Sequence, residues 1–413
     1  MNALLRVVEK KEKIMENGKN TALKSSWAAA FTVASVWFGT HVGGGFATGN
    51  QVIGYFVQYG WTAVIWPILS MALLAVVMYV IARFARLRGL TNYKDTFREL
   101  WNPYPQMELT FELFYVVIIL AAVAAAVSGA ANLIVSATGL PYIVCCALTI
   151  AVLVVLSIFG IKLIIAVSTF LSAAILVIVA VMVVVGLTNS PNGLLGGFAA
   201  EGVYNENAWE AFYRGIPVYA GFQCVSIPSF IAASTTVTNN KGVKKAAVLG
   251  GLMNGLALAA SGFMLIAWYP QIMEALPVAL ENIANGVAAT NPRTMPNLWI
   301  CQTIGWNWMT VIYSLLLFCA FVSTSVTLLY SMIDRFEGKL PESVPGTARK
   351  VIVGAIVLAL CFGVSLMGLT NIINKVYGYC GYFAIVFVML PVLILGIKKN
   401  KQWVAEHPNC LDD

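Results

Sequence analysis

Charged residues are scarce in this sequence. Of its 413 residues only 10% are Asp, Glu, Lys or Arg, whereas 60% are apolar. Soluble globular domains contain about 25% charged and about 45–50% apolar residues. Too few charged side chains are present to cover the surface of an ordinary soluble fold, which is therefore excluded. No polar block of domain size separates the apolar stretches between residues 27 and 397, and this indicates a single membrane domain.

Histidines are few, and cysteines are not clustered. Only one of the two histidines, His41, lies in an apolar stretch, and the eight cysteines are scattered without a C-x-x-C pair. The apolar stretches contain neither an H-E-x-x-H motif nor a pair of aspartates. A zinc site, a disulfide framework and a membrane enzyme with buried acids and bases are therefore not expected. We predict that the protein is not an enzyme and needs no organic cofactor.

Ten apolar segments are long enough to cross a membrane. A hydrocarbon core about 30 Å thick requires roughly 20 residues of helix. The ten predicted spans cover residues 26–59, 62–82, 108–138, 142–159, 161–187, 207–236, 246–269, 297–332, 347–367 and 371–397.

The positions of the basic residues support this count, because Lys and Arg concentrate in cytoplasmic loops. With ten helices and a cytoplasmic N-terminus, Arg214, Arg293 and Lys375 are the only three of the 25 basic residues on the outer side. We therefore expect a multi-pass protein of the cell membrane. Residues 1–24 would form a cytoplasmic segment, residues 25–398 the transmembrane domain, and residues 399–413 a cytoplasmic tail.

The net charge of +7 does not indicate a nucleic-acid partner. The basic residues lie in short clusters between apolar stretches rather than along one polar face. The expected partners are the lipid bilayer and a small-molecule solute. The oligomeric state is not indicated by the sequence.

The first and sixth segments contain residues that break helices. The first includes GTHVGGGFATGN at residues 39–50, with three consecutive glycines at Gly43, Gly44 and Gly45; each glycine disfavours helix by about 1 kcal/mol relative to alanine. The sixth is interrupted by Gly215, Pro217, Gly221 and Pro228. Backbone freed within a membrane must be satisfied by protein or by a polar cavity, so a broken span indicates an internal site.

The two interrupted segments are five helices apart. This spacing is typical of transporters built from inverted repeats, in which the ends of half-helices hold the solute and coupling ions. Gly43, Gly44 and Gly45 would then bind an anionic group of the solute through their backbone. In the alternative interpretation, the glycines only allow close packing of helices. A channel, or a sensor that binds without transporting, would also be compatible with such a membrane domain.

The string GTHVGGGFATGNQ at residues 39–51 resembles the G-x-x-x-G-x-G-F-A-[ST]-G-Q-E signature of the YkvI-type amino acid permease family. That family belongs to the amino acid-polyamine-organocation superfamily with the LeuT-type fold. The resemblance implies an all-α integral membrane protein with ten transmembrane helices in two inverted five-helix repeats, helices 1 and 6 being broken. It also implies secondary active transport of a small solute, such as an amino acid or related amine, by alternating access with sodium or proton coupling.

The resemblance also implies particular site residues. Thr40, His41 and the three glycines would bind substrate together with Tyr219, Phe222 and Gln223 of the sixth segment. The eighth segment is similar to the helix that completes a sodium site in LeuT-type transporters. A sodium ion would be held by the carbonyl groups of Gly39, Val42 and Ala320 and by the hydroxyl groups of Ser323 and Thr324.

Two features of the broken segment leave its chemistry open. The family's Gln-Glu pair is replaced here by Asn50 and Gln51, so the carboxylate is missing. His41 is ionisable, and such a residue within a membrane is a candidate functional group. It could carry a proton, line the substrate pocket or hydrogen-bond a free backbone carbonyl.

Overall fold

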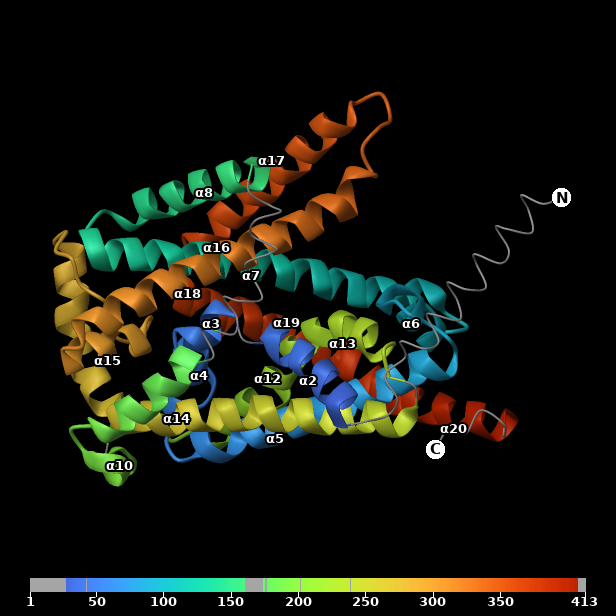
Figure 1. The fold of residues 1–413 in the computed structure, drawn as a ribbon, viewed down its shortest axis with the longest axis horizontal. Coiled ribbons are helices and arrows are strands. Elements are labelled where there is room, and N and C mark those ends of the chain that lie inside the picture. The colour runs from blue at the N-terminus through green and yellow to red at the C-terminus, as the bar shows by residue number, and fades with distance from the viewer. Residues whose placement is uncertain are drawn as a thin grey trace.

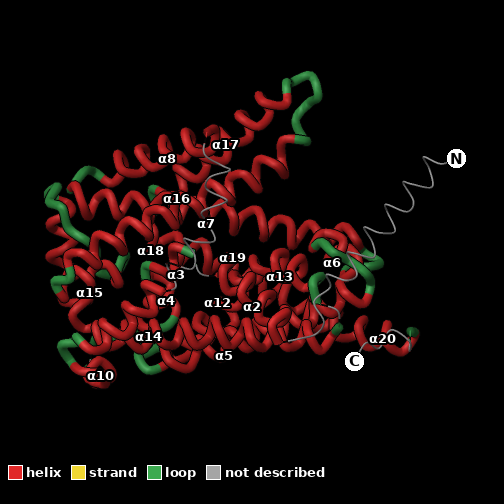
Figure 2. Tube along the Cα trace, in the orientation of Figure 1, coloured by secondary structure: helices red, strands yellow, loops and turns green. Residues whose placement is uncertain are grey.

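The computed structural model describes residues 27–41, 43–159, 174, 177–200, 202–237 and 239–407. In these ranges the regular elements are helices, and no strand occurs among them (Figure 2). Seven of the described helices are long and apolar enough to cross a membrane. The prediction of an all-α membrane fold is therefore confirmed.

The helices follow the predicted segments in order. The first segment is divided, as described below, and the fifth is only partly described, with an apolar helix at Val177–Thr188. Two short helices, α6 and α10, lie between segments. The second segment forms α5 (Thr62–Leu87), the third α7 (Glu108–Thr138), the fourth α8 (Tyr142–Phe159) and the ninth α17 (Gly346–Ser365). The connecting helices are α6 (Tyr93–Leu100) and α10 (Gly193–Gly196).

The tenth segment is helical throughout but alternates between α-helical and π-helical turns. The wider turns lie at Ile372–Tyr377, Ile385–Met389 and Val392–Gly396. Its α-helical parts are α18 (Leu369–Asn371), α19 (Gly378–Ala384) and α20 (Ile397–Glu406).

The seventh and eighth segments differ from the predicted boundaries. Helix α14 (Asn240–Ala284) continues well beyond residue 269 and contains Pro270 and Pro277. Its extension is held by side chains that remain buried, including Ile272 and Ala279. The predicted span 297–332 is instead two helices, α15 (Pro296–Ile304) and α16 (Asn307–Glu337). They are separated at Gly305, whose φ of 82° lies in the left-handed region that favours glycine.

The first segment is broken where the glycines predict. Helix α2 (Trp27–His41) ends at His41, and Gly43 has an extended backbone before α3 (Gly44–Ala47) begins. A second turn at Gly49, with φ 83°, leads into α4 (Asn50–Tyr55). The segment then ends in a 3-10 turn at Val57–Tyr59. The polypeptide therefore leaves helical geometry in the middle of its first crossing.

The sixth segment departs from α-helical geometry at the predicted residues but stays helical. It consists of α11 (Ala208–Tyr213), a π-turn at Arg214–Val218, α12 (Tyr219–Phe222), a 3-10 turn at Gln223–Ser226, and α13 (Ile227–Ser234). Pro217 lies inside the π-turn, and Pro228 lies in the first turn of α13, where its missing N–H would have no partner in any case. Changes in helix type thus absorb the breakers without unwinding the chain.

The helices form two groups, and each group contains segments from both halves of the sequence. Helix α14 packs extensively against α5 and α2, and α13 also packs on α2 and α5. On the other side α7 packs against α8, α16 and α17 (Figure 1). Each group combines segments at equivalent positions in the two five-helix halves: first, second, sixth and seventh in one, third, fourth, eighth and ninth in the other. This arrangement fits two repeats, and α3 and α12 lie between the groups.

Candidate functional site

A cavity of about 320 Å³ lies between the two helix groups at the break in the first segment. Residues of α2, α3, α7, α13 and α16 contribute to its wall. Ten of the residues predicted from the sequence line it together: Gly39, Thr40, His41, Gly43, Gly44, Gly45, Phe222, Gln223, Ser323 and Thr324. Segments separated by more than 170 residues along the chain therefore meet at one place.

Two predicted site residues are placed differently, and a third is not described. Tyr219 is buried behind the cavity wall and contacts His41 rather than lining the cavity. Ala320 is buried on α16 and does not line the cavity. Val42 lies outside the described residues.

His41 joins three segments through its imidazole ring. Its Nδ1 atom hydrogen-bonds Oδ1 of Asn254 on α14, and its Nε2 atom lies 3.0 Å from the Tyr219 hydroxyl group. The Asn254 amide nitrogen donates to the Gly250 carbonyl oxygen at 2.8 Å, so its Oδ1 atom is the acceptor for His41. In a neutral ring Nδ1 then carries the proton and Nε2 accepts from Tyr219. Of the three roles considered for His41, lining the pocket agrees with its place in the cavity wall, whereas its two ring nitrogens contact side chains rather than a free backbone carbonyl.

The Tyr219 hydroxyl group also reaches the cavity indirectly. It lies 3.4 Å from Oε1 of Gln51, which is one of the lining residues. Because His41 itself lines the cavity, its two hydrogen bonds connect Asn254 and Tyr219 to the cavity wall.

Gly44 allows an aromatic ring to pack directly on the broken segment. A Cβ atom at Gly44 would lie 2.0 Å from Cε1 of Phe321, and one at Gly129 on α7 would lie 2.2 Å from Cζ of the same ring. The Phe321 ring is thus held between two glycines of different segments. Because the ring lines the cavity, its position determines how much room a solute has.

Carbonyl groups freed after the break are satisfied by distant side chains. The Ala47 carbonyl oxygen accepts hydrogen bonds from the Asn297 amide, at 2.9 Å, and from the Tyr313 hydroxyl group. The Thr48 carbonyl oxygen accepts from the Asn297 backbone N–H at 3.2 Å. These contacts meet the requirement that a broken membrane helix has its polar backbone paired within the protein.

Asn50 ties the same segment to a loop and to the tenth segment. Its amide nitrogen lies 3.1 Å from the carbonyl oxygens of Arg293 and Thr294 and 2.8 Å from the Thr370 hydroxyl oxygen. The resembled signature has Gln at this position. Here Asn50 closes one side of the broken segment, whereas the cavity extends the opposite way, toward Ser229 and Leu328.

Sequence reasoning missed several of these residues. Asn254, Asn297, Tyr313 and Phe321 were not predicted, and Asn50 and Gln51 were noted only as departures from the signature. The one available signal was an uncharged amide within an apolar span, as at Asn254, because such a group needs a buried partner. Which partner it finds could not be read from the sequence.

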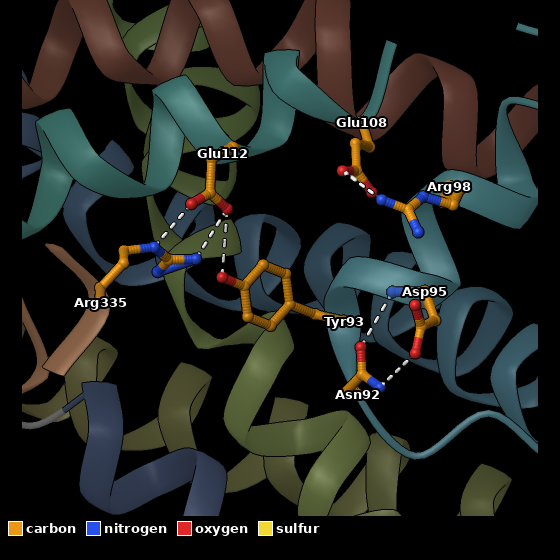
Figure 3. A network of polar contacts seen from close by, with 7 residues as sticks. All are labelled: Asn92, Tyr93, Asp95, Arg98, Glu108, Glu112 and Arg335. Atoms are coloured by element: carbon orange, nitrogen blue, oxygen red, sulfur yellow. Dashed lines mark hydrogen bonds and ion pairs between the residues drawn. The ribbon is translucent and has the colours of Figure 1, made fainter. Parts of the chain in front are cut away.

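A second polar network lies at the end of α7 nearest α6 (Figure 3). Glu112 accepts hydrogen bonds from Arg335 at 2.6 and 2.7 Å and from the Tyr93 hydroxyl group at 3.2 Å. The Arg335 guanidinium group also lies 5.3 Å from the ring centre of Tyr115, which lines the cavity. This bidentate pair connects α7 to α16 next to Tyr115 of the cavity wall.

Replacing Glu112 by glutamine is expected to lower the free energy of unfolding by about 2 kcal/mol. Arg335 would lose its carboxylate partner, although about 83% of the Arg335 side chain is covered by the protein. The matched control is Lys350→Gln, which breaks the Glu337 pair of 3.6 Å, where the lysine is 55% exposed. This control should cost under about 1 kcal/mol. Thermal unfolding in one detergent measures both, and equal losses would contradict the assignment of a stabilising role to the Glu112 pair.

Comparison with known proteins agrees with this architecture. The chain is 21% identical over 369 residues to the uncharacterized membrane protein YkvI of Bacillus subtilis, with 89% of this chain and 96% of YkvI covered. No family model matches the chain. The inward-facing conformation of Mhp1 superposes with a TM-score of 0.56 at 16% identity, covering 91% of both chains.

The chain has a LeuT-type fold. Two further structures with that fold are similar: MhsT in complex with L-phenylalanine, with a TM-score of 0.54 at 17% identity, and a substrate-bound outward-open Na⁺-coupled sialic acid symporter, with a TM-score of 0.54 at 16% identity. They cover 90% and 89% of this chain and are covered over 94% and 78% of their own lengths. The resemblance stated for the signature is thus supported by sequence and by fold, and none of these relatives is named as an enzyme.

Proposed function

We propose that this protein is a secondary transporter that moves a small zwitterionic solute, such as an amino acid, through the cavity at the broken first helix. The observation that carries the proposal is the meeting of the helix break at Gly43, and of the first turn of α3 at Gly44 and Gly45, with a cavity between two repeat-related helix groups. LeuT-type relatives include a complex with L-phenylalanine and a Na⁺-coupled symporter. Their names support this class of function.

The chemistry of the cavity supports a solute without net charge. Its described lining contains hydroxyl, amide and aromatic groups and no Asp, Glu, Lys or Arg side chain. A solute with a net charge would lose hydration without gaining an opposite charge, which is costly in a membrane interior. A zwitterion can instead place its carboxylate on free N–H groups and its ammonium group on carbonyl and hydroxyl oxygens. A volume of about 320 Å³ lies at the lower end of ligand pockets, about 300–1,000 Å³, and fits a small molecule.

The position of the cavity, together with the predicted topology, indicates that the protein is in an inward-facing conformation. Asn50 and Asn297 bind the broken segment on the side predicted to face outward. Gly39 and Thr40 line the cavity on the α2 side and are exposed. In this orientation the N- and C-terminal segments are cytoplasmic, and the protein resides in the cell membrane. Alternating access would exchange the Asn50 closure for closure near Tyr115 and Arg335.

Uptake into proteoliposomes tests the proposal. We expect accumulation of at least one neutral amino acid, driven by an inward sodium or proton gradient and abolished when the gradient is collapsed. Binding without flux would identify a sensor, and currents far above carrier turnover would identify a channel; either result would overturn the proposal.

Sodium is proposed as the coupling ion, held near Ser323 and Thr324 with the Gly39 carbonyl group. All three residues line one cavity, and hard cations prefer oxygen ligands. Replacing both hydroxyl residues by alanine should raise the sodium concentration for half-maximal uptake at least tenfold. Ser325→Ala is the control, because Ser325 is buried on the same helix but does not line the cavity. Uptake that is independent of sodium in the wild type would leave proton coupling as the alternative.

A further inference from the structure

A separate cavity lies in a furrow between α5 and α14, on the surface of the molecule that would face the lipid. The two helices run side by side along one edge of the molecule (Figure 1). The furrow encloses about 280 Å³ and is lined by aliphatic side chains along most of its length. Ile68, Val76, Val248 and Leu252 on its rims are 38–50% exposed. Within a bilayer these exposed rims face lipid tails.

The floor of the furrow exists because the helices approach closely. A Cβ atom at Gly251 would lie 2.9 Å from the Cβ atom of Ala75 and 3.2 Å from the Met71 carbonyl oxygen. The floor of the furrow is low because its residues have small side chains, namely Ala75, Ala247 and Gly251, while larger side chains form the rims. The contacts of Gly251 with Ala75 and of Gly262 with Ala63 show that the helices are antiparallel.

One end of the furrow is basic. Lys244 and Tyr79 belong to its lining. Because the helices are antiparallel, the next turn of α5 brings Arg83 to the same end, and the preceding turn of α14 brings Lys241. The buried Nε atom of Arg83 has no hydrogen-bond partner within the described residues. Helix α5 contains no Asp or Glu, and the first acidic residue of α14 is Glu274, so this basic end has no acidic counterpart on either helix.

We infer that the furrow is a binding site for one anionic phospholipid, with an acyl chain along Ala72, Ala75 and Gly251 and the phosphate group beside Lys244 and Arg83. The twelve residues from Ile68 to Tyr79 are separated by eleven rises of about 1.5 Å, a span of roughly 16 Å. One leaflet of hydrocarbon is about 15 Å thick, half of the 30 Å core. Basic pockets between helices at the membrane surface are suited to anionic headgroups.

The site is tested with the purified full-length chain in neutral detergent. Native mass spectrometry with equal amounts of phosphatidylglycerol and phosphatidylcholine, carrying identical acyl chains, reports the occupancy of each. We expect at least fivefold higher occupancy by phosphatidylglycerol. The double variant Lys241→Gln/Lys244→Gln should reduce this preference, because Arg83 is then the one described basic side chain left at this end of the furrow. Both lysines are exposed, so we expect the variant to fold as the wild type does.

Two further variants separate the two parts of the site. Ala72→Phe fills the furrow from an exposed position and should reduce the occupancy of both lipids. Lys401→Gln, an exposed charge on α20, is the control and should change neither.

Several outcomes would overturn the inference. They are equal occupancy by the two lipids in the wild type, the same thermal stabilisation by inorganic phosphate alone as by phosphatidylglycerol, or a dimer that Ala72→Phe dissociates. The last would make the furrow an interface between two copies of the chain. None of these measurements depends on transport, so the lipid site and the proposed function can fail separately.

Discussion

Replacing Gly44 by alanine is expected to reduce uptake at least tenfold and to lower the melting temperature. The new methyl group would lie 2.0 Å from the Phe321 ring, and that ring has Gly129 on its other side. The ring cannot move away without entering α7 or the cavity. Overpacking of this kind costs about 1–3 kcal/mol.

Gly43→Ala is the matched control for this prediction. Among the described residues, no atom lies within 4 Å of a Cβ atom built at Gly43, and the φ of −95° at this position suits any residue. Both variants keep the backbone N–H groups proposed to bind substrate. Comparable losses of uptake and stability in both would show that Phe321 packing is not the cause. Adding Phe321→Leu to Gly44→Ala should restore stability.

Replacing His41 by leucine is expected to reduce uptake at least tenfold and to destabilise the protein by about 1–2 kcal/mol. The side-chain Oδ1 atom of Asn254 and the Tyr219 hydroxyl group would both lose a buried partner. Asn254→Leu should cost a similar amount, because it leaves the His41 Nδ1 atom unpaired. The double variant should cost about 1 kcal/mol less than the sum of the two single variants, since neither orphaned group remains.

Ser261→Ala provides the control for this double-mutant cycle. Ser261 is buried two turns from Asn254 on α14, and its hydroxyl oxygen has no hydrogen-bond partner within the described residues. Its removal should be neutral. Melting temperatures in one detergent, with uptake measured in parallel, would decide the matter. Strictly additive effects would show that His41 and Asn254 do not act as a pair.

The glycine run at residues 43–45 predicted the break correctly because backbone preference is a local property. The same reasoning failed in part for the sixth segment, where glycine and proline predicted a similar interruption. There the chain remains helical, since a π-turn accommodates Pro217 and a 3-10 turn precedes Pro228. Whether a breaker unwinds a helix depends on the neighbours that can pair the freed groups, and these are set by packing.

Most residues predicted for the site line one cavity, and they lie on the broken first segment, on the sixth segment or on one face of the eighth segment. Ser323 and Thr324 do reach the cavity with Gly39, whereas Ala320 does not line it. Tyr219 serves the site through His41 instead of through the cavity wall. The pattern of residue types within one segment indicates which residues are unusual but not which way each side chain points.

By itself the sequence determined that this is an all-α membrane protein, where its apolar segments lie and where the first of them breaks. Those features follow from hydrophobic length and glycine content within about 30 residues. Only the tertiary structure decided that Asn297 and Tyr313 pair the freed Ala47 carbonyl group, that Asn254 holds His41, and that α14 continues to Ala284. These outcomes depend on contacts between groups more than 200 residues apart or on burial against other helices, which local preference does not encode.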